Sequence, residues 1–402
     1  MQKTFHHLTF AALIVFALGT FTSVSFSALG HILLLGPGIY FTIKNFKDVK
    51  LSRTTWALLG VVLSIILSVI FNLDILEKPL ANIFKAKYFI IPVLGIFALN
   101  ELGKGYLNDK KISWALNLFL LATTVASLSG IVAYYTGFNY LKMKPGCHPE
   151  RACGLYGMYM TYGYGISLFQ VILVGFLLYR KEVSKWLPTW RVVTAFVING
   201  LGLYLAFARG GWIGFLLPLP LFFLKKKKRM MIALSMGVLL AFVLSYSFVT
   251  PFKNMLQNRE GSNDQRISFA KTAIVAFKEK PIFGWGYRNF EPNVKALKKK
   301  YHIAYEYFGG HAHNNYLEHL ASTGILGFLA FALFTFFWLL ESYKRDDLIA
   351  RITFPFVASF IVSGLFQYTF GDGENLFLIM TIFMIFEATS VGIFVKKSLP
   401  ES

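Results

Sequence analysis

Charged side chains are scarce in this chain of 402 residues. They make up 15% of the sequence, whereas apolar types make up 55% and 42 residues are phenylalanine. A soluble globular domain carries about 25% charged residues, so the composition excludes an ordinary soluble protein. Apolar runs close to the length that crosses the hydrocarbon core of a bilayer, about 20 residues, recur along the chain. The sequence therefore predicts an all-α polytopic membrane protein.

Acidic residues are half as frequent as basic ones, at 20 against 40, which leaves a formal net charge of +20. A soluble protein with such a charge would suggest nucleic-acid binding. Here many basic residues flank apolar runs, and the basic run 225–229 follows one directly. Because lysine and arginine concentrate in the cytoplasmic loops of membrane proteins, we expect membrane lipids around the chain and no nucleic-acid partner.

Cysteine is almost absent, since the chain contains only Cys147 and Cys153, in the segment CHPERAC. This cluster offers too few ligands for a convincing zinc site. A local disulfide is expected if the segment faces an oxidising compartment. A pair of free thiols is the alternative that the sequence leaves open.

We expect about twelve membrane spans in a single domain that covers residues 1–402. Their approximate ranges are 8–24, 26–43, 55–72, 88–103, 114–136, 155–179, 191–208, 212–224, 230–250, 319–341, 352–370 and 375–395. The first could be mistaken for a signal peptide, but a second span follows almost at once, so we interpret it as a retained helix. Basic residues gather in the even-numbered connections, which predicts that both chain ends lie in the cytoplasm.

One outward connection, residues 251–311 between the ninth and tenth spans, is long and basic. Its first sixty residues hold eleven Lys or Arg and five Asp or Glu. Residues 262–281 are typical of a helix that Pro281 ends, and residues 293–308 of a second, basic amphipathic helix. One face of the first helix is expected to hold Ile267, Ala270, Ile274 and Phe277. Such helices commonly lie in the membrane interface, so we expect a lid on the outward face of the membrane.

A polar motif stands directly before the tenth span. His311 and His313 lie two residues apart, Asn314 follows, and after a nine-residue spacer come Gly324 and Gly327. Two small residues within a span let another backbone approach closely. A histidine near a membrane surface is often only a satisfied polar side chain. A zinc site that adds Glu318 and His319 is a further alternative, although the spacing differs from His-Glu-x-x-His.

Two other segments accompany this motif, and together they resemble the bacterial O-antigen ligase and O-antigen polymerase superfamily. In ARGGWIG, Arg209 opens the element, and Ile213 stands where the ligase form has leucine. In RISFAKTAIVAFKEKPIFGWGYRNF, Arg266 opens a helix that ends in Pro-x-x-Gly-x-Gly. Tyr287 and Arg288 replace residues that are usually small in the family, so no role is carried over to them. The resemblance covers residues 205–330 and is closest to the ligase.

The resemblance implies a GT-C-like glycosyltransferase of the bacterial inner membrane, with its active site and the lid of residues 251–311 on the periplasmic face. The implied donor is a glycan on undecaprenyl diphosphate, and the acceptor is a hydroxyl of a lipid A-core sugar. Arg209 and Arg266 would bind the diphosphate, because a guanidinium donates paired hydrogen bonds to phosphate. His313 would act as general base, supported by His311 and by Asn314. A lipid diphosphate is already activated, so no metal or cofactor is implied, and we expect a monomer.

Other functions remain open at this stage. An O-antigen polymerase would use a second lipid-linked repeat unit as acceptor. Polymerases of this class tend to carry Arg, ten residues and Gly in two outer loops, and none of the five outer arginines tested has glycine at that spacing. A relative that transfers glycans to protein is a further alternative. A transporter usually holds ionisable groups at mid-membrane, where Glu387 is the only clear acid.

Overall fold

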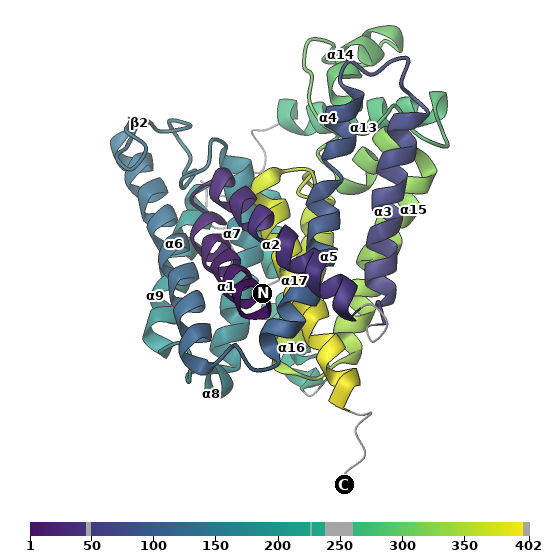
Figure 1. Ribbon diagram of the computed structural model, residues 1–402. Helices are drawn as coiled ribbons and strands as arrows, with labels where there is room; N and C mark the ends of the chain where they lie inside the picture. Colours follow the sequence, from purple (N-terminus) through teal and green to yellow (C-terminus); the bar gives the residue numbers. More distant parts are fainter. Residues whose placement is uncertain (46–49, 226, 238–259, 397–402) are drawn as a thin grey trace.

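The computed structural model describes residues 1–45, 50–225, 227–237 and 260–396, and Figure 1 shows their arrangement. Helices dominate this part of the chain. Its strands are β1 (Phe138–Asn139) and β2 (Lys144–Pro145), which pair antiparallel in a small hairpin. The predicted all-α class is therefore confirmed for the described residues.

Seven helical segments in the described residues are long and apolar enough to cross a membrane. They are α2 (Val24–Asn45), α3 (Arg53–Ile70), the segment Pro79–Gly103 that contains α4 (Pro79–Phe84) and α5 (Lys87–Gly103), α6 (Asp109–Thr136), α7 (Tyr159–Leu178), α15 (Asn315–Lys344) and α17 (Gly373–Lys396). The other helices of the bundle are α1 (Gln2–Gly19), α8 (Arg180–Val183), α9 (Thr189–Leu205), α10 (Arg209–Leu216), the 3-10 helix η1 (Leu219–Phe223) and α16 (Leu348–Gly364). The predicted count of twelve spans is not confirmed.

Two of the expected spans do not coincide with a single described helix. The range expected at 212–224 is divided, because α10 ends at Leu216 and a 3-10 helix follows it. The range expected at 230–250 lies mostly outside the described residues. The remaining ten ranges each coincide with a helix, with boundaries displaced by a few residues at either end.

The expected outer connection contains α13 (Glu260–Glu279) and α14 (Phe290–Lys300), which lie at one end of the helix bundle (Figure 1). The second helix ends at Lys300 rather than near residue 308. The two helices share a small apolar core that includes Phe269, Ala273 and Val294. Ile267 and Ile274 of the predicted apolar face are exposed, at 53% and 42%, because α13 packs inward through the neighbouring positions.

The turn after α13 inserts into a break in α15. Gly324 has φ 67° and ψ −163°, which interrupts the helix, and the Ile325 amide donates to the Pro281 carbonyl at 2.8 Å. The Trp285 amide donates to the Ala321 carbonyl at 2.9 Å. A Cβ at Gly324 would lie 2.3 Å from the Ile282 carbonyl oxygen, so this position requires glycine. Here the first glycine of the motif meets another backbone, as expected.

The β1–β2 hairpin and its continuation lie at the same end of the bundle as α13 and α14 (Figure 1). Cys147 and Cys153 form a disulfide in this segment, which decides between the two alternatives left open by the sequence. The Ala152 amide donates to the Leu205 carbonyl at 2.9 Å. The segment is therefore tied to the end of α9, just before α10 begins.

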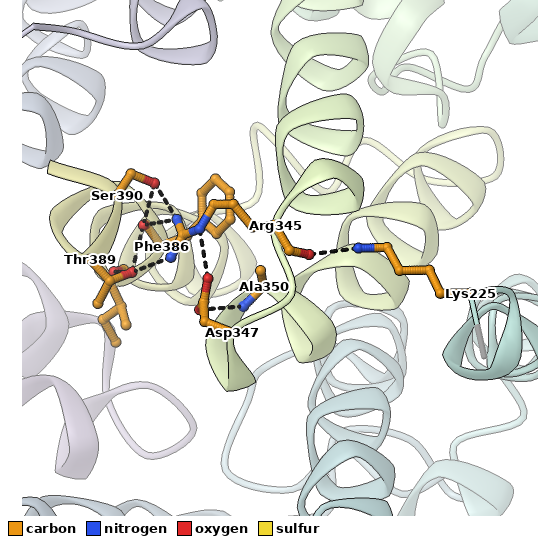
Figure 2. Close-up of polar contacts among 8 residues, drawn as sticks. Lys225, Arg345, Asp347, Ala350, Phe386, Thr389 and Ser390 are labelled. Atoms are coloured by element: carbon orange, nitrogen blue, oxygen red, sulfur yellow. Dashed lines mark hydrogen bonds and ion pairs between the residues drawn. The ribbon is translucent and has the colours of Figure 1, made fainter. Parts of the chain in front are cut away.

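At the opposite end of the bundle, Arg345 joins the connection between α15 and α16 to the last turns of α17 (Figure 2). Its Nε pairs with Asp347 Oδ2 at 2.8 Å. Its two Nη groups donate to the Phe386 carbonyl at 2.8 Å, to the Thr389 hydroxyl at 2.9 Å and to the Ser390 hydroxyl. This side chain therefore fixes three elements to one another.

Candidate functional site

His313 lies in the turn that precedes α15, and its ring is held in one orientation. The ring Nδ1 lies 2.8 Å from Gln367 Oε1. An amide oxygen only accepts hydrogen bonds, so in the neutral ring Nδ1 carries the proton and Nε2 is the basic nitrogen. Burial lowers the pKa of His313 below 6.5, and the nearby charges of Arg266 and Lys298 act in the same direction, whereas the Gln367 contact opposes them. The ring is therefore neutral near pH 7.

His311 supports the turn rather than facing away from it. Its Nδ1 accepts from the backbone amide of His313 at 3.1 Å, and the two ring centroids are 4.2 Å apart. Burial lowers the pKa of His311 to about 3, with further contributions from His313 and Arg288. A neutral ring with unprotonated Nδ1 can accept this bond, which stabilises the left-handed backbone of His313 at φ 50°.

The same turn is held from below by Glu318 on the first turns of α15. One carboxylate oxygen accepts from the Ala312 amide at 2.8 Å and the other from the Ser322 hydroxyl at 3.0 Å. Glu318 is 3% exposed, so both carboxylate oxygens accept their hydrogen bonds from protein groups rather than from water. His319 stacks on Phe331 inside the bundle, and in the described residues no group of three or more His, Cys, Asp or Glu could hold a metal ion.

Asn314 caps α15 and connects it to the end of α16. Its Oδ1 accepts from the amides of Tyr316 and Leu317 at 2.8 and 3.0 Å, and its Nδ2 donates to the Leu365 carbonyl at 3.0 Å. The next residue, Asn315, donates to the Thr369 hydroxyl at 3.0 Å. These bonds fix the connection after α16, which carries Gln367. Asn314 therefore holds both the start of α15 and the segment that contacts the His313 ring.

Arg209 and Arg266 approach each other at Tyr164, near the start of α7. The Tyr164 hydroxyl donates to the Phe366 carbonyl at 3.3 Å, and it lies close to the charges of Arg266 and Arg209. A Cβ added at Gly210 would lie 1.9 Å from that hydroxyl, so the glycine after Arg209 permits the contact. Arg209 also donates to Asn263 Oδ1 at 3.3 Å. Arg266 also contributes to the pKa of His313. Arg209, Arg266 and His313 therefore belong to one cluster.

Arg288 is a third arginine beside this cluster. Its Nη2 donates to the Gly371 carbonyl at 2.7 Å, and its backbone has φ 64°. Its buried Nε has no hydrogen-bond partner in the described part of the chain. Its charge reaches His311. No role was predicted for Arg288 from the sequence, although it lies two residues after the Gly-x-Gly turn.

Asp372 follows the same connection toward α17. Its Oδ2 accepts from the Thr161 hydroxyl at 2.7 Å and from Asn375 Nδ2 at 3.4 Å. Burial raises the pKa of Asp372 to about 7, helped by Glu374 and opposed by the charge of Arg288. The connection therefore supplies a carboxyl group that changes charge near neutral pH.

Lys298 on α14 is buried behind His313. Its ammonium lies 3.8 Å from the centre of the Phe269 ring and donates to the Phe308 carbonyl at 3.0 Å. The Phe269 ring in turn contacts the His313 ring, with centroids 5.3 Å apart. Burial lowers the pKa of Lys298 to about 8. The site therefore contains cations and neutral histidines, an arrangement suited to a negatively charged ligand.

The helices and this cluster define a multi-pass membrane protein with a polar, positively charged site at one end of its bundle. Residues 194–332, which include Arg209, Arg266 and His313, match the family described as O-antigen ligase. This match supports membership of the chain in the O-antigen ligase family, and the resemblance inferred from the motifs is confirmed.

A curated relative carries no functional description. It is an uncharacterized protein of Haemophilus influenzae (strain ATCC 51907 / DSM 11121 / KW20 / Rd), 25% identical over 269 residues. The similar part covers 61% of this chain and 65% of the relative. The chain thus matches less than two thirds of the length of that protein, and the relative's name assigns no substrate.

Proposed function

We propose that the protein is an O-antigen ligase, which transfers a glycan from undecaprenyl diphosphate to a hydroxyl group of a lipid A-core sugar. The observation that carries the proposal is the gathering of Arg209, Arg266 and His313 at one end of the bundle. These residues come from three segments that are far apart in the chain. The family match over residues 194–332 supports the same reaction class.

The two arginines would bind the diphosphate of the donor. When the bond between the anomeric carbon and the phosphate oxygen breaks, the electron pair stays on the diphosphate, whose charge grows. Fixed guanidinium groups stabilise that charge without reorganisation, and such preorganised contacts are often the largest contribution to catalysis. The Tyr164 hydroxyl, which contacts Arg266, orients this guanidinium toward the leaving group.

His313 would act as the general base. Its Nε2 accepts the proton of the acceptor hydroxyl while the new bond forms between that oxygen and the anomeric carbon. Direct displacement inverts the configuration at this carbon. Because the His313 pKa lies below 6.5, the ring is unprotonated at neutral pH. Gln367 would act as a positioning residue by holding Nδ1, and a base of this kind typically contributes about 10²–10⁴-fold.

The proposal includes the location and organisation of the chain. We propose a single GT-C-like domain of about twelve spans over residues 1–402, in the bacterial inner membrane, with the site on the periplasmic face. The Cys147–Cys153 disulfide at the same end supports this orientation, because disulfides persist in oxidising compartments. Residues 251–311 would act as a lid over the site. The protein would work as a monomer without metal or cofactor.

An O-antigen polymerase is the second candidate function, because the family match does not distinguish the two acceptors. Transfer to a protein acceptor is less favoured. A lipid-linked glycan transporter is also less favoured, because the cationic groups around His313, namely Arg209, Arg266, Arg288 and Lys298, lie at one end of the bundle and not at mid-membrane.

A reconstituted transfer assay separates these functions. Purified protein is mixed with lipid-linked glycan and lipid A-core, with and without a chelator. A ligase yields glycosylated core in both conditions. Longer lipid-linked chains without modified core would contradict the ligase assignment and indicate a polymerase, and loss of product with chelator would contradict the metal-independent mechanism.

A further inference from the structure

A lateral groove runs between α3 and α15, away from the proposed active site. It has a volume of about 520 Å³, and its lining is almost entirely apolar. Leu63, Leu329 and Leu333 line it and are 55%, 49% and 47% exposed. The groove follows α3 from Arg53 to Leu67, a length of about 21 Å at 1.5 Å per residue.

The two ends of this groove differ. At the end nearer the proposed active site, the turn after α13 lies across both helices. Phe283 stacks on Phe71 with centroids 4.0 Å apart, and the Gly284 carbonyl accepts from Asn72 Nδ2 at 3.0 Å. The turn also contacts α15 at Gly324. This end of the groove is therefore closed by the docked connection.

The other end is open and basic. Arg53 lines it together with Trp56, which is 62% exposed. Glu341 lies nearby, but its two oxygens accept from the Arg53 backbone amide at 3.1 Å and from the Thr54 hydroxyl at 2.5 Å. In the described residues the Arg53 guanidinium forms no ion pair with a carboxylate. Exposed tryptophan and arginine together are typical of the level of lipid headgroups.

We propose that this groove binds one acyl chain of an anionic phospholipid, whose phosphate pairs with Arg53. A single leaflet is about 15 Å thick, half of the hydrocarbon core. The groove is about 21 Å long, so the whole of an acyl chain that enters beside Arg53 can lie within it. The isoprenoid donor would fit less well, because its diphosphate belongs at the closed end and its apolar tip would meet Arg53. Charge complementarity therefore favours a phospholipid of the opposite leaflet.

Native mass spectrometry of the purified full-length protein tests this proposal. The delipidated protein is titrated with phosphatidylglycerol, with phosphatidylethanolamine of the same chains and with undecaprenyl phosphate. We expect one phosphatidylglycerol to be retained at least tenfold more tightly than phosphatidylethanolamine. Arg53→Gln should remove this difference, and Ala330→Phe, which fills the groove opposite Gly60, should weaken both phospholipids.

Lys181→Gln provides a matched control, because Lys181 is exposed and does not line the groove. It should retain the wild-type preference. Arg53→Gln changes an exposed side chain, so the proposal stays testable even if Ala330→Phe does not fold. Equal retention of the two phospholipids by the wild type, or an unchanged preference in Arg53→Gln, would overturn the proposal. Preferential retention of undecaprenyl phosphate that Ala330→Phe abolishes would assign the groove to the carrier lipid instead.

Discussion

Arginine side chains stand at both ends of the helix bundle, and their surroundings differ. At one end, the Arg345 guanidinium donates hydrogen bonds to Asp347, to the Phe386 carbonyl and to two hydroxyl groups (Figure 2). At the other end, neither Arg266 nor Arg288 forms an ion pair with a carboxylate in the described part of the chain. Arg345 uses four of its five N–H donors within the protein and thereby holds it together, whereas a guanidinium with no carboxylate partner can bind an anion.

The largest expected effect is the loss of the proposed base, His313, which should slow transfer without changing the arginines at either end. We expect His313→Ala to lower the rate of glycan transfer by about 10²–10⁴-fold, because the base is removed, while the arginines still bind donor. His302→Asn is a control, because His302 is exposed and asparagine tolerates its left-handed backbone. Transfer and donor binding are measured at equal protein level. An active His313→Ala enzyme would exclude His313 as the base.

Conservative replacement of Arg266 and Arg345 addresses the comparison directly. We expect Arg266→Lys to reduce transfer about tenfold or more, since lysine cannot reproduce the paired donors, with an unchanged melting temperature. Arg345→Lys should lower the melting temperature and leave the activity per folded molecule unchanged. Loss of stability in both variants, or lower turnover of fully folded Arg345→Lys protein, would contradict the different roles assigned to the two arginines.

Complete removal of Arg345 should destabilise the protein by about 2–3 kcal/mol, because buried carbonyl and hydroxyl acceptors and Asp347 lose a charged partner. Lys181→Gln is a suitable control at the same end of the bundle, since Lys181 is exposed. Unfolding in detergent with increasing denaturant measures the difference. An Arg345→Ala protein as stable as the wild type would contradict a stabilising role for Arg345.

The pH dependence should show smaller effects. The folded-state pKa of His313 lies below its unfolded value of 6.5, so the neutral base persists below pH 6.5 and transfer declines only at lower pH. The same shift contributes stability that is complete above pH 6.5 and decreases as the pH falls through the folded pKa. Gln367→Leu should move the acidic limb to still lower pH, because it removes the contact that raises the His313 pKa, and should lower the rate severalfold.

The profile of transfer rate against pH, with circular dichroism at each pH, distinguishes the two contributions. An acidic limb above pH 6.5 that coincides with unfolding would contradict the role of a buried neutral histidine. An unchanged limb in Gln367→Leu would contradict the role assigned to the Nδ1 contact.

Hydrogen exchange should reveal the smallest difference between the two ends. We expect residues 260–310, in the described part of the proposed lid, to exchange faster than the spans and to slow when lipid diphosphate is added, as expected for a lid that closes on its ligand. Residues 345–350 should not respond. Equal responses at both ends, or an absence of any response in residues 260–310, would count against a lid.

The pattern of residues along the chain determined much of this protein. Apolar runs predicted the helical membrane class, and the motifs around Arg209, Arg266 and His313 pointed to the candidate site before any contact was known. Helical periodicity was less informative for α13, where Ile267 and Ile274 are exposed. An apolar stripe indicates that one face avoids water, but it cannot distinguish a membrane surface from a protein core.

The tertiary structure alone decided which other residues belong to the site. Gln367, Tyr164, Arg288 and Asp372 lie on three different segments, and no spacing in the sequence relates them to His313. They meet because α7 and α15 begin and α16 ends at the same end of the bundle, and because Gly210 and Gly324 leave room for the Tyr164 hydroxyl and for the backbone at Ile282. Contacts of this kind depend on how helices pack, which is set by side-chain shape across elements and not by local periodicity. The same packing decided which arginines retain donors for a ligand.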